Sequence, residues 1–261
     1  MAWGLNDYGQ TSVPADLSGV TAISAGYRHT VALKTDGTVV AWGRNDAGQT
    51  TVPAGLGGVT TIAAGNTFTL ALKSDGTVVA WGDNTFGQTA IPTGLSGVTA
   101  VGAGDLHTVA LKSDGVLVAW GNNIYNQTTP PAGLNGVTAV AAGNGHSVAL
   151  KSDGTVVAWG RSDSGQTTIP AGLSGVTAIA SGYAHTVTVA IAPSLTASAG
   201  GNNLTLLWPD AATGFRVESA LSLSPQLTWN NVTGSFQTDG GSISIVLPIT
   251  GTQKFYRLTK P

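Results

Sequence analysis

A repeat of 39 residues constrains this sequence more than any other feature. The tripeptide Ala-Trp-Gly recurs with its tryptophan at Trp3, Trp42, Trp81, Trp120 and Trp159, each 39 positions after the previous one. A second motif, Gly-x-x-His-Thr or a close variant, keeps the same spacing and begins at Gly26, Gly65, Gly104, Gly143 and Gly182. Units of this length predict a repeat architecture in which each unit buries its apolar face against its neighbours.

Each unit contains four runs that are typical of β-strands. In the second unit they are residues 38–42, a run centred on 49–52, residues 59–64 and residues 69–74. The runs favour β-branched or small residues and are bounded by Gly, Pro, Asn or Asp. Asp-Gly pairs such as Asp36-Gly37 follow the fourth run and predict tight hairpins, because glycine accepts a positive φ. Four antiparallel strands in about 40 residues indicate a β-propeller blade.

The composition agrees with an all-β protein. Charged residues make up 9% of the 261 residues, against about 25% in ordinary soluble domains, and 37 residues are glycine. Glu, Lys and Arg, which favour helices, are scarce, while 42% of the residues are hydrophobic and can form a core. We therefore expect an all-β fold with a β-propeller of five four-stranded blades.

The chain is predicted to contain two domains. Residues 1–192 carry the repeats. Residues 193–261 lack the 39-residue motifs and instead contain runs of alternating apolar and polar residues at 204–208, 215–217, 227–229, 242–247 and 254–258. This second region predicts a small β-sandwich, similar to a fibronectin type III domain. The sequence begins inside a first-strand motif at Ala2-Trp3-Gly4, so the two ends of the repeat region could complete one blade and close a ring. An open arc of blades is the alternative.

Several classes of function are excluded by charge and composition. A net charge of −2 and a pI near 6 argue against a nucleic-acid partner, which needs a concentrated basic surface. No apolar run approaches 18 residues, so membrane insertion is not expected. The absence of cysteine excludes disulfides, thiolate metal sites and a cysteine nucleophile. Residues 1–4 have no basic or apolar segment of the kind found in signal peptides.

The repeat motifs resemble a known family. Val-Val-Ala-Trp-Gly-x-Asn-x-x-Gly-Gln and Gly-x-x-His-Thr-Val-Ala-Leu-Lys-Ser-Asp-Gly resemble the regulator of chromosome condensation repeat, whose members build seven-bladed propellers. Residues 48–54 and 174–180 look most like the bacterial branch that includes β-lactamase inhibitory protein II. This chain has five units rather than seven. Residues 193–261 resemble C-terminal modules of secreted bacterial repeat proteins, which implies an extracellular or cell-surface location.

The five units can be compared with one another. The Asp-Gly turns at one end of each blade scarcely change, whereas both loops at the other end vary freely. We call this second end the loop face: residues 5–8, 44–47, 83–86, 122–125 and 161–164, together with 27–28, 66–67, 105–106, 144–145 and 183–184. A constant framework with one variable face is typical of a scaffold that presents a binding surface, although exposed loops also drift neutrally.

We therefore predict a non-enzymatic binding scaffold, with a protein as the partner. A carbohydrate-binding propeller and a structural cell-surface repeat protein are the alternatives. Tyr, Arg and polar residues are favoured at binding surfaces. The candidate partner-binding residues are Tyr8, Tyr27, Arg28, Arg44, Asp46, Asp83, Phe86, Asp105, Tyr125, Arg161, Asp163 and Tyr183. In the β-lactamase inhibitor the corresponding loops are dominated by aromatic residues, so the resemblance extends to the face and not to the target.

Other candidate chemistry receives a structural interpretation. His29, His107, His146 and His185 share one repeat position with Phe68, which favours a packing role with a hydrogen bond inside the blade over a metal site. The periodic tryptophans are predicted to pack between blades. The Asn and Asp residues of the loops lack the spacing of a calcium loop, and no catalytic motif occurs. We expect no cofactor, no metal and no enzymatic activity.

The net charge of the chain is predicted to lie on the loop face. The Lys and Asp residues of the Asp-Gly turns cancel one another. The loop face carries Asp7, Asp46, Asp83, Asp105 and Asp163 against Arg28, Arg44 and Arg161, and five negative charges minus three positive charges leave −2. A mildly acidic loop face is expected.

Overall fold

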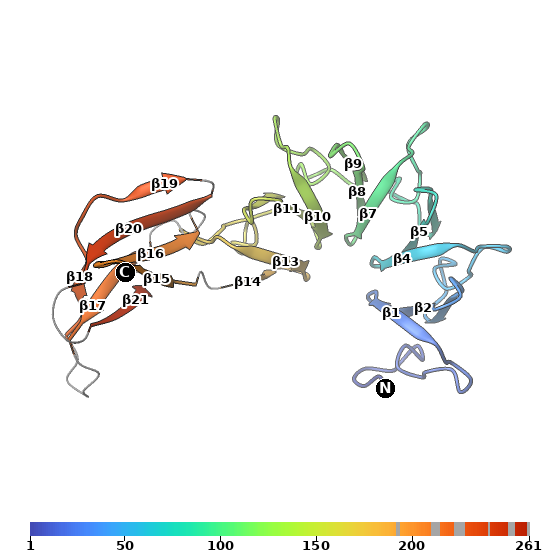
Figure 1. Ribbon diagram of the computed structural model, residues 1–261. Coiled ribbons are helices and arrows are strands. Elements are labelled where there is room, and N and C mark those ends of the chain that lie inside the picture. Colours follow the sequence, from blue (N-terminus) through green and yellow to red (C-terminus); the bar gives the residue numbers. More distant parts are fainter. Residues whose placement is uncertain (192–193, 210–214, 222–227, 240, 250–253, 260–261) are drawn as a thin grey trace. The chain divides into compact units, whose positions relative to one another are not determined.

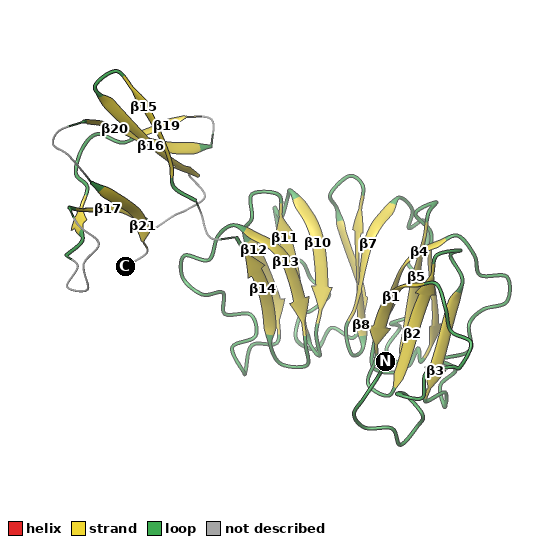
Figure 2. Cartoon of the chain, turned by 60° about the horizontal axis from the view of Figure 1, so that its bottom comes forward, coloured by secondary structure: helices red, strands yellow, loops and turns green. Residues whose placement is uncertain are grey.

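The computed structural model describes residues 1–191, 194–209, 215–221, 228–239, 241–249 and 254–259. These residues form β-strands and loops without a helix (Figure 2), and they include no helical segment suited to crossing a membrane. The chain divides into two compact units. Unit one comprises residues 1–152, 156–169 and 178–189, and unit two comprises 153–155, 170–177 and 190–261. The predicted domain boundary at 192/193 lies outside the described residues.

Four sheets of three antiparallel strands and one two-stranded sheet follow the repeats (Figure 1). The sheets are β1 (Val20–Ala25), β2 (His29–Lys34) and β3 (Val39–Gly43); β4 (Val59–Ala64), β5 (Phe68–Lys73) and β6 (Val78–Gly82); β7 (Val98–Ala103), β8 (His107–Lys112) and β9 (Leu117–Gly121); β10 (Val137–Ala142), β11 (His146–Lys151) and β12 (Val156–Gly160); and β13 (Val176–Ser181) with β14 (Thr186–Ala190). Each sheet is a simple meander of consecutive strands. The all-β repeat fold is therefore as predicted.

One of the four strands expected in each blade, the run centred on 49–52 in the second unit, is not formed. Residues 49–52 lie in a turn and an extended segment outside the sheets. The side chain of Gln49 is fully buried, and its Oε1 accepts a hydrogen bond from the backbone N–H of Ala47 at 2.9 Å. The Gln49 carbonyl accepts from Trp81 Nε1 at 3.0 Å and from Thr69 Oγ1 at 2.8 Å. The backbone carbonyl of Gln49 is thus hydrogen-bonded by side chains instead of by the backbone N–H of a neighbouring strand.

The predicted hairpins at the Asp-Gly turns are confirmed. Gly76 has a φ of 78°, in the left-handed region that favours glycine. The N–H of Lys73 donates to the carbonyl of Thr77 at 2.9 Å, and the N–H of Thr77 donates to Asp75 Oδ1 at 3.0 Å. Lys73 Nζ lies 2.9 Å from Asp75 Oδ2. The turn is therefore closed by its own side chains.

Neighbouring sheets share their apolar cores. Val31, Leu33 and Val39 of the first sheet pack with Ile62 and Trp81 of the second, and the same pattern recurs along unit one. The packing role predicted for the tryptophans holds for Trp81, Trp120 and Trp159, which are buried.

The histidines join sheets rather than bonding inside one blade, which corrects the sequence-based expectation. His29 Nε2 lies 3.1 Å from Thr69 Oγ1, and His107 Nε2 lies 2.9 Å from Ser147 Oγ, in each case in the next sheet. The reason is geometric: the histidine begins the middle strand of its sheet and faces the middle strand of the next one.

The expected joint blade between the two ends of the repeat region is not formed. Residues 2–4 form no strand, and the sheet that contains β14 has β13 as its other member. Trp3 is 84% exposed, whereas Trp81 is 8% exposed. Ile23 of β1 is likewise 75% exposed, against 8% for its repeat equivalent Ile62. The first sheet therefore presents an apolar surface that the later sheets bury.

Unit two contains two further antiparallel sheets. They are β15 (Thr196–Gly200), β16 (Asn203–Pro209), β20 (Ser242–Pro248) and β19 (Gln237–Asp239), and β18 (Asn230–Asn231), β17 (Arg216–Ala220) and β21 (Phe255–Thr259). Leu206, Trp208, Val217 and Ile245 form a core to which both sheets contribute. Four of the five predicted runs overlap strands, and the run at 227–229 extends outside the described residues. The likeness to a fibronectin type III domain stays a prediction.

Candidate functional site

The two variable loops of each blade lie against each other, as the loop-face prediction requires. The N–H of Arg44 donates to the carbonyl of Arg28 at 2.8 Å. The equivalent backbone bonds join Asp83 to Thr67, Asn122 to Leu106 and Arg161 to Gly145. Variable side chains from distant parts of one repeat are thereby brought to one surface.

A pocket of about 270 Å³ lies on the axis of unit one, where the Gly-x-x-His loops meet. In Figure 1 the strands β1, β4, β7 and β10 lie innermost, around this axis. The pocket is lined by the side chains of one repeat position, namely Tyr27, Asn66, Asp105, Asn144 and Tyr183, together with alanines and glycines of the preceding residues and Ser181. One position of the repeat therefore supplies the variable part of the lining.

Backbone hydrogen bonds connect these loops from one blade to the next. The N–H of Asn66 donates to the carbonyl of Asp105 at 3.3 Å, and the N–H of Asp105 donates to that of Gly143 at 3.1 Å. The N–H of Asn144 donates to the carbonyl of Tyr183 at 3.2 Å. The lining side chains thus stand on a connected backbone, which limits their movement.

The glycine that opens each loop allows this close approach. A Cβ atom on Gly104 would lie 2.3 Å from Cε1 of His107 and 2.6 Å from the carbonyl oxygen of Gly143. Both separations are shorter than atoms tolerate, so a larger residue would push the histidine and the next blade away. The repeated Gly-x-x-His motif therefore belongs to the support of the pocket.

Asp105 is held by two amides. Asn66 Nδ2 donates to Asp105 Oδ2 at 3.5 Å, and Asn144 Nδ2 donates to the same oxygen. Asn144 in turn accepts a hydrogen bond from Arg161 Nη1 on its Oδ1, at 3.0 Å. This bond orients the amide so that its nitrogen faces the carboxylate.

A first cluster of cations and aromatic rings lies beside the pocket. Arg28 forms an ion pair with Asp7 at 3.0 Å, and its guanidinium lies 4.7 Å from the ring centre of Tyr8 and 5.2 Å from that of Tyr27. Arg44 also approaches Tyr8, at 5.3 Å. Arg44 is fixed by Asp46 at 2.8 Å. Stacking of this kind favours a planar guanidinium on a tyrosine face.

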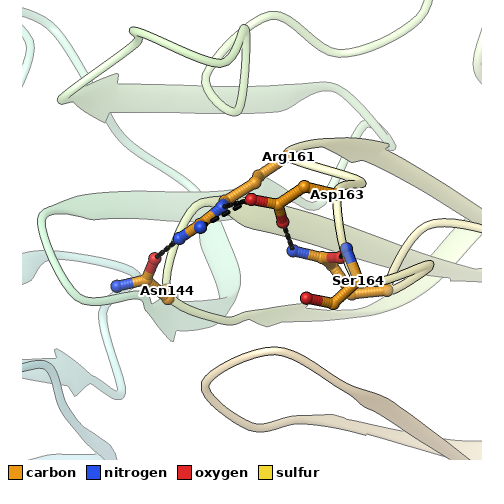
Figure 3. Close-up of polar contacts among 5 residues, drawn as sticks. Asn144, Arg161, Asp163 and Ser164 are labelled. Atoms are coloured by element: carbon orange, nitrogen blue, oxygen red, sulfur yellow. Dashed lines mark hydrogen bonds and ion pairs between the residues drawn. The ribbon is translucent and has the colours of Figure 1, made fainter.

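A second cluster lies around Arg161 (Figure 3). Arg161 Nη2 lies 2.6 Å from Asp163 Oδ2, and the guanidinium lies 5.3 Å from the ring centre of Tyr125. The hydrogen bond from Arg161 lowers the pKa of Asp163, and a bond from Gln166 adds to this. Figure 3 shows Arg161 between Asn144 and Asp163. Because Asn144 lines the pocket, Arg161 joins this cluster to the pocket wall.

Two predicted site residues, Phe86 and Asp83, lie in neither the pocket nor either cluster. Phe86 is 47% exposed on its own loop. Asp83 accepts hydrogen bonds from Thr85 and Gln88 of its own loop and from Thr67 of the paired loop. Burial opposes ionisation of Asp83, but these bonds lower its pKa overall. Asp83 therefore stabilises its own turn and the paired loop, and its role toward a partner stays a prediction.

Asn66, Asn144 and Asp7 are candidate site residues that the predicted set omitted. All three lie in loops recognised as variable, and Asn66 and Asn144 share the repeat position of Tyr27. The signal was the repeat position itself, because every copy of a position around a common axis must face the same space. Asn66 and Asn144 are neither aromatic nor charged, so residue type alone does not select them.

The histidines offer no metal centre among the residues that the structure describes, and no other group of ligating residues gathers there. Burial lowers the pKa of His29 to about 4 and that of His107 to about 4, with the charge of His146 adding to the effect at His107. Both are therefore neutral at pH 7 and serve as hydrogen-bonding partners between sheets.

Comparisons with known proteins agree with the architecture. The model of the regulator of chromosome condensation (RCC1) repeat matches residues 20–49, 59–88, 98–127 and 137–166. A search of curated proteins gave no match.

Solved structures with the same fold include human WBSCR16, with 21% identity and a TM-score of 0.63 over 72% of this chain and 66% of the other. Prp20p from Saccharomyces cerevisiae has 22% identity and a TM-score of 0.56 over 76% and 59%. The CRINKLY WD40 ectodomain of the Arabidopsis thaliana receptor kinase ACR4 has 24% identity and a TM-score of 0.57 over 72% and 68%. This chain thus spans 66% of WBSCR16 and 59% of Prp20p. The chain carries four matched regulator of chromosome condensation repeats and shares the fold of propellers built from them.

Proposed function

We propose that this chain is a non-enzymatic binding scaffold whose loop face receives a protein partner. The observation that carries the proposal is the axial pocket with its two flanking clusters, where side chains from several blades form one composite surface. Tyr27 and Tyr183 are 63% and 64% exposed at this surface although they are large aromatic residues. Tyrosine and arginine are enriched at the hot spots of protein interfaces, the residues that contribute most of the binding free energy.

The likeness to Prp20p supports this proposal at the level of fold. The published description of that structure concerns binding of Prp20p to Gsp1p and histones. At 22% identity the partners of Prp20p are not transferred to this chain. The fold is nevertheless one that serves protein binding elsewhere. An extracellular or cell-surface location is part of the proposal and rests on sequence resemblance alone.

A carbohydrate-binding function is the second candidate. A propeller lectin commonly repeats one pocket in every blade, whereas here the same repeat position holds Tyr, Asn or Asp in different copies. One composite site at the axis therefore favours a single partner. Because Asn66, Asp105 and Asn144 stand where the β-lactamase inhibitor carries aromatic residues, we do not expect nanomolar inhibition of a β-lactamase.

Affinity capture with the full chain tests the proposal. Tyr27→Ala combined with Tyr183→Ala should weaken capture of the native partner by about 5- to 150-fold, as expected for the loss of about 1–3 kcal/mol at interface tyrosines. The fold should be unchanged, because both side chains are mostly exposed. The matched control is Lys73→Ala combined with Lys112→Ala on the Asp-Gly turns, which should capture the partner normally.

Equal capture by the wild type and the tyrosine variant would contradict the proposal. Loss of capture in the lysine variant alone would place binding on the opposite end of the sheets. A glycan array probed with the same proteins would support the lectin candidate if it gave binding that the tyrosine variant loses.

A further inference from the structure

The charge of the loop face is almost entirely neutralised within the chain. Ion pairs join Arg28 to Asp7, Arg44 to Asp46 and Arg161 to Asp163. Of the five loop-face aspartates this leaves Asp83, which holds its own turn, and Asp105. In the part of the chain that the structure describes, one loop-face carboxylate, that of Asp105, therefore both lacks an ion-pair partner and lines the pocket.

Asp105 is the charged side chain of the axial pocket. The other lining residues are tyrosines, asparagines, alanines, glycines and one serine. Among the described residues, no Lys or Arg lies within ion-pair distance of the Asp105 carboxylate. Asn66 and Asn144 fix the position of the carboxylate but are neutral, so they leave its charge uncompensated.

The surroundings of Asp105 suit a cationic side chain with an apolar stem. Ala64, Ala103 and Ala142 of the inner strands give the pocket small apolar walls, and Tyr27 and Tyr183 stand at its rim. Tyrosine faces attract ammonium and guanidinium groups, and a half-enclosed carboxylate attracts them more strongly than an exposed one. The pocket volume of about 270 Å³ is enough for one long side chain.

The supporting contacts point to the same ligand. Arg161 fixes the Asn144 amide so that its N–H groups face Asp105, while Asp163 neutralises Arg161 itself. The pocket is therefore preorganised around a negative charge, and Arg161 is paired with Asp163. A carboxylate that is held in place and carries no paired cation favours a ligand that supplies the opposite charge.

We propose that the axial pocket binds one lysine or arginine side chain of the partner protein, with its cationic group paired to Asp105. This inference rests on the proposed function, because it names the chemistry that the loop face recognises. Tyr27 and Tyr183 contact the stem or the planar head of the inserted side chain. Asp105 supplies specificity for charge, and the tyrosines supply contact area.

Titration of the full chain followed by NMR tests this proposal. The probes are Nα-acetyl-lysine methylamide and Nα-acetyl-arginine methylamide, with neutral Nα-acetyl-norleucine methylamide as the matched control. One or both cationic probes should shift the side-chain amide signals of Asn66 and Asn144, and added salt should weaken the effect. Norleucine should leave these signals unchanged. The response to lysine against arginine identifies which cation the pocket prefers.

The variant Asp105→Asn should bind the cationic probe at least about 10-fold more weakly, since each 1.4 kcal/mol of a lost ion pair is a factor of ten. Asp83→Asn removes an equal charge from the same face outside the pocket and should bind like the wild type. Should Asp105→Asn fail to fold, the comparison with norleucine and the salt dependence in the wild type decide the question.

Three results would overturn the inference: no shift with either cationic probe, equal shifts with norleucine, or unchanged binding by Asp105→Asn. Failure here is distinct from failure of the proposed function. If the tyrosine variant loses partner capture while Asp105→Asn keeps it, the loop face binds a partner that does not insert a cation. If the pocket binds the probes while the tyrosine variant captures the partner normally, the pocket is selective for a cation but the proposed function of the loop face fails.

Discussion

At the scale of single residues, one repeat position takes different roles according to its surroundings. His29 and His107 are buried and bridge to a hydroxyl of the next sheet, while Phe68 fills the same position with an apolar ring. Both solutions satisfy close packing, because the imidazole has a partner for its Nε2 and the phenyl ring needs none. The Nδ1 atoms of His29 and His107 are buried without a partner, which adds a reason for them to stay uncharged.

The buried histidines predict a loss of stability in mild acid. Burial lowers the pKa of His107 to about 4, whereas an unfolded chain titrates histidine near 6.5. Between these values the unfolded state binds more protons, so the free energy of unfolding falls as the pH drops from about 6.5 to about 4. The variant His107→Phe, which copies Phe68, has no imidazole to protonate. Its free energy of unfolding should therefore fall less with pH than that of the wild type, by up to about 1.4 kcal/mol for each unit by which burial lowers the histidine pKa.

Urea denaturation of the wild type and of His107→Phe at pH 7.0 and pH 4.5 measures this effect. Aspartates titrate mostly below this window, so they contribute little to the difference. Asp239→Asn, which removes an exposed charge in unit two, serves as the control. An identical pH dependence in His107→Phe and the wild type would show that this histidine is protonated without cost.

At the scale of elements, the segment that follows the third strand of a sheet (β3, β6 or β9) connects two sheets instead of extending one. The Gln49 carbonyl receives the Trp81 indole and the Thr69 hydroxyl, and the same arrangement recurs at Gln88 and Gln127. Hydrogen bonding and apolar packing therefore act on the same tryptophan. The blade is thus stabilised largely by contacts with its neighbour, as in other repeat proteins.

Matched tryptophan variants test this arrangement. Trp81→Ala should reduce the free energy of unfolding by about 3–5 kcal/mol, because it leaves a cavity between sheets. Trp3→Ala removes the same side chain from an exposed position and should change the free energy of unfolding by less than about 0.5 kcal/mol. Chemical denaturation compares the two, and equal costs would mean that burial of the tryptophan is not what matters.

At the scale of the whole molecule, the repeats of unit one are equivalent in sequence but not in environment. Ile62 of β4 is packed by the preceding sheet, while Ile23 of β1 is exposed. The position of a sheet in the series therefore decides whether its apolar face is covered.

The same substitution, isoleucine to alanine, should have different effects on stability at two copies of this repeat position. Ile62→Ala should cost about 2–5 kcal/mol, whereas Ile23→Ala should cost less than about 0.5 kcal/mol. Denaturation midpoints at low protein concentration provide the measurement. A large cost for Ile23→Ala would mean that another surface covers β1 in solution.

The sequence by itself determined the repeat, the all-β fold, the hairpins at the Asp-Gly turns and the common face of the two variable loops. These features follow from local rules: alternation of side chains, glycine at a positive φ, and the geometry of a meander. Three strands per sheet, the bridging role of His29 and His107, and the exposure of Trp3 and Ile23 were decided by the tertiary structure. So was the choice of Asp105 over Asp83 as the pocket carboxylate. All of these features depend on contacts between different blades. The Gln49 carbonyl, for example, accepts its hydrogen bond from Trp81, which lies 32 residues further along the chain, and no local sequence pattern specifies such a contact.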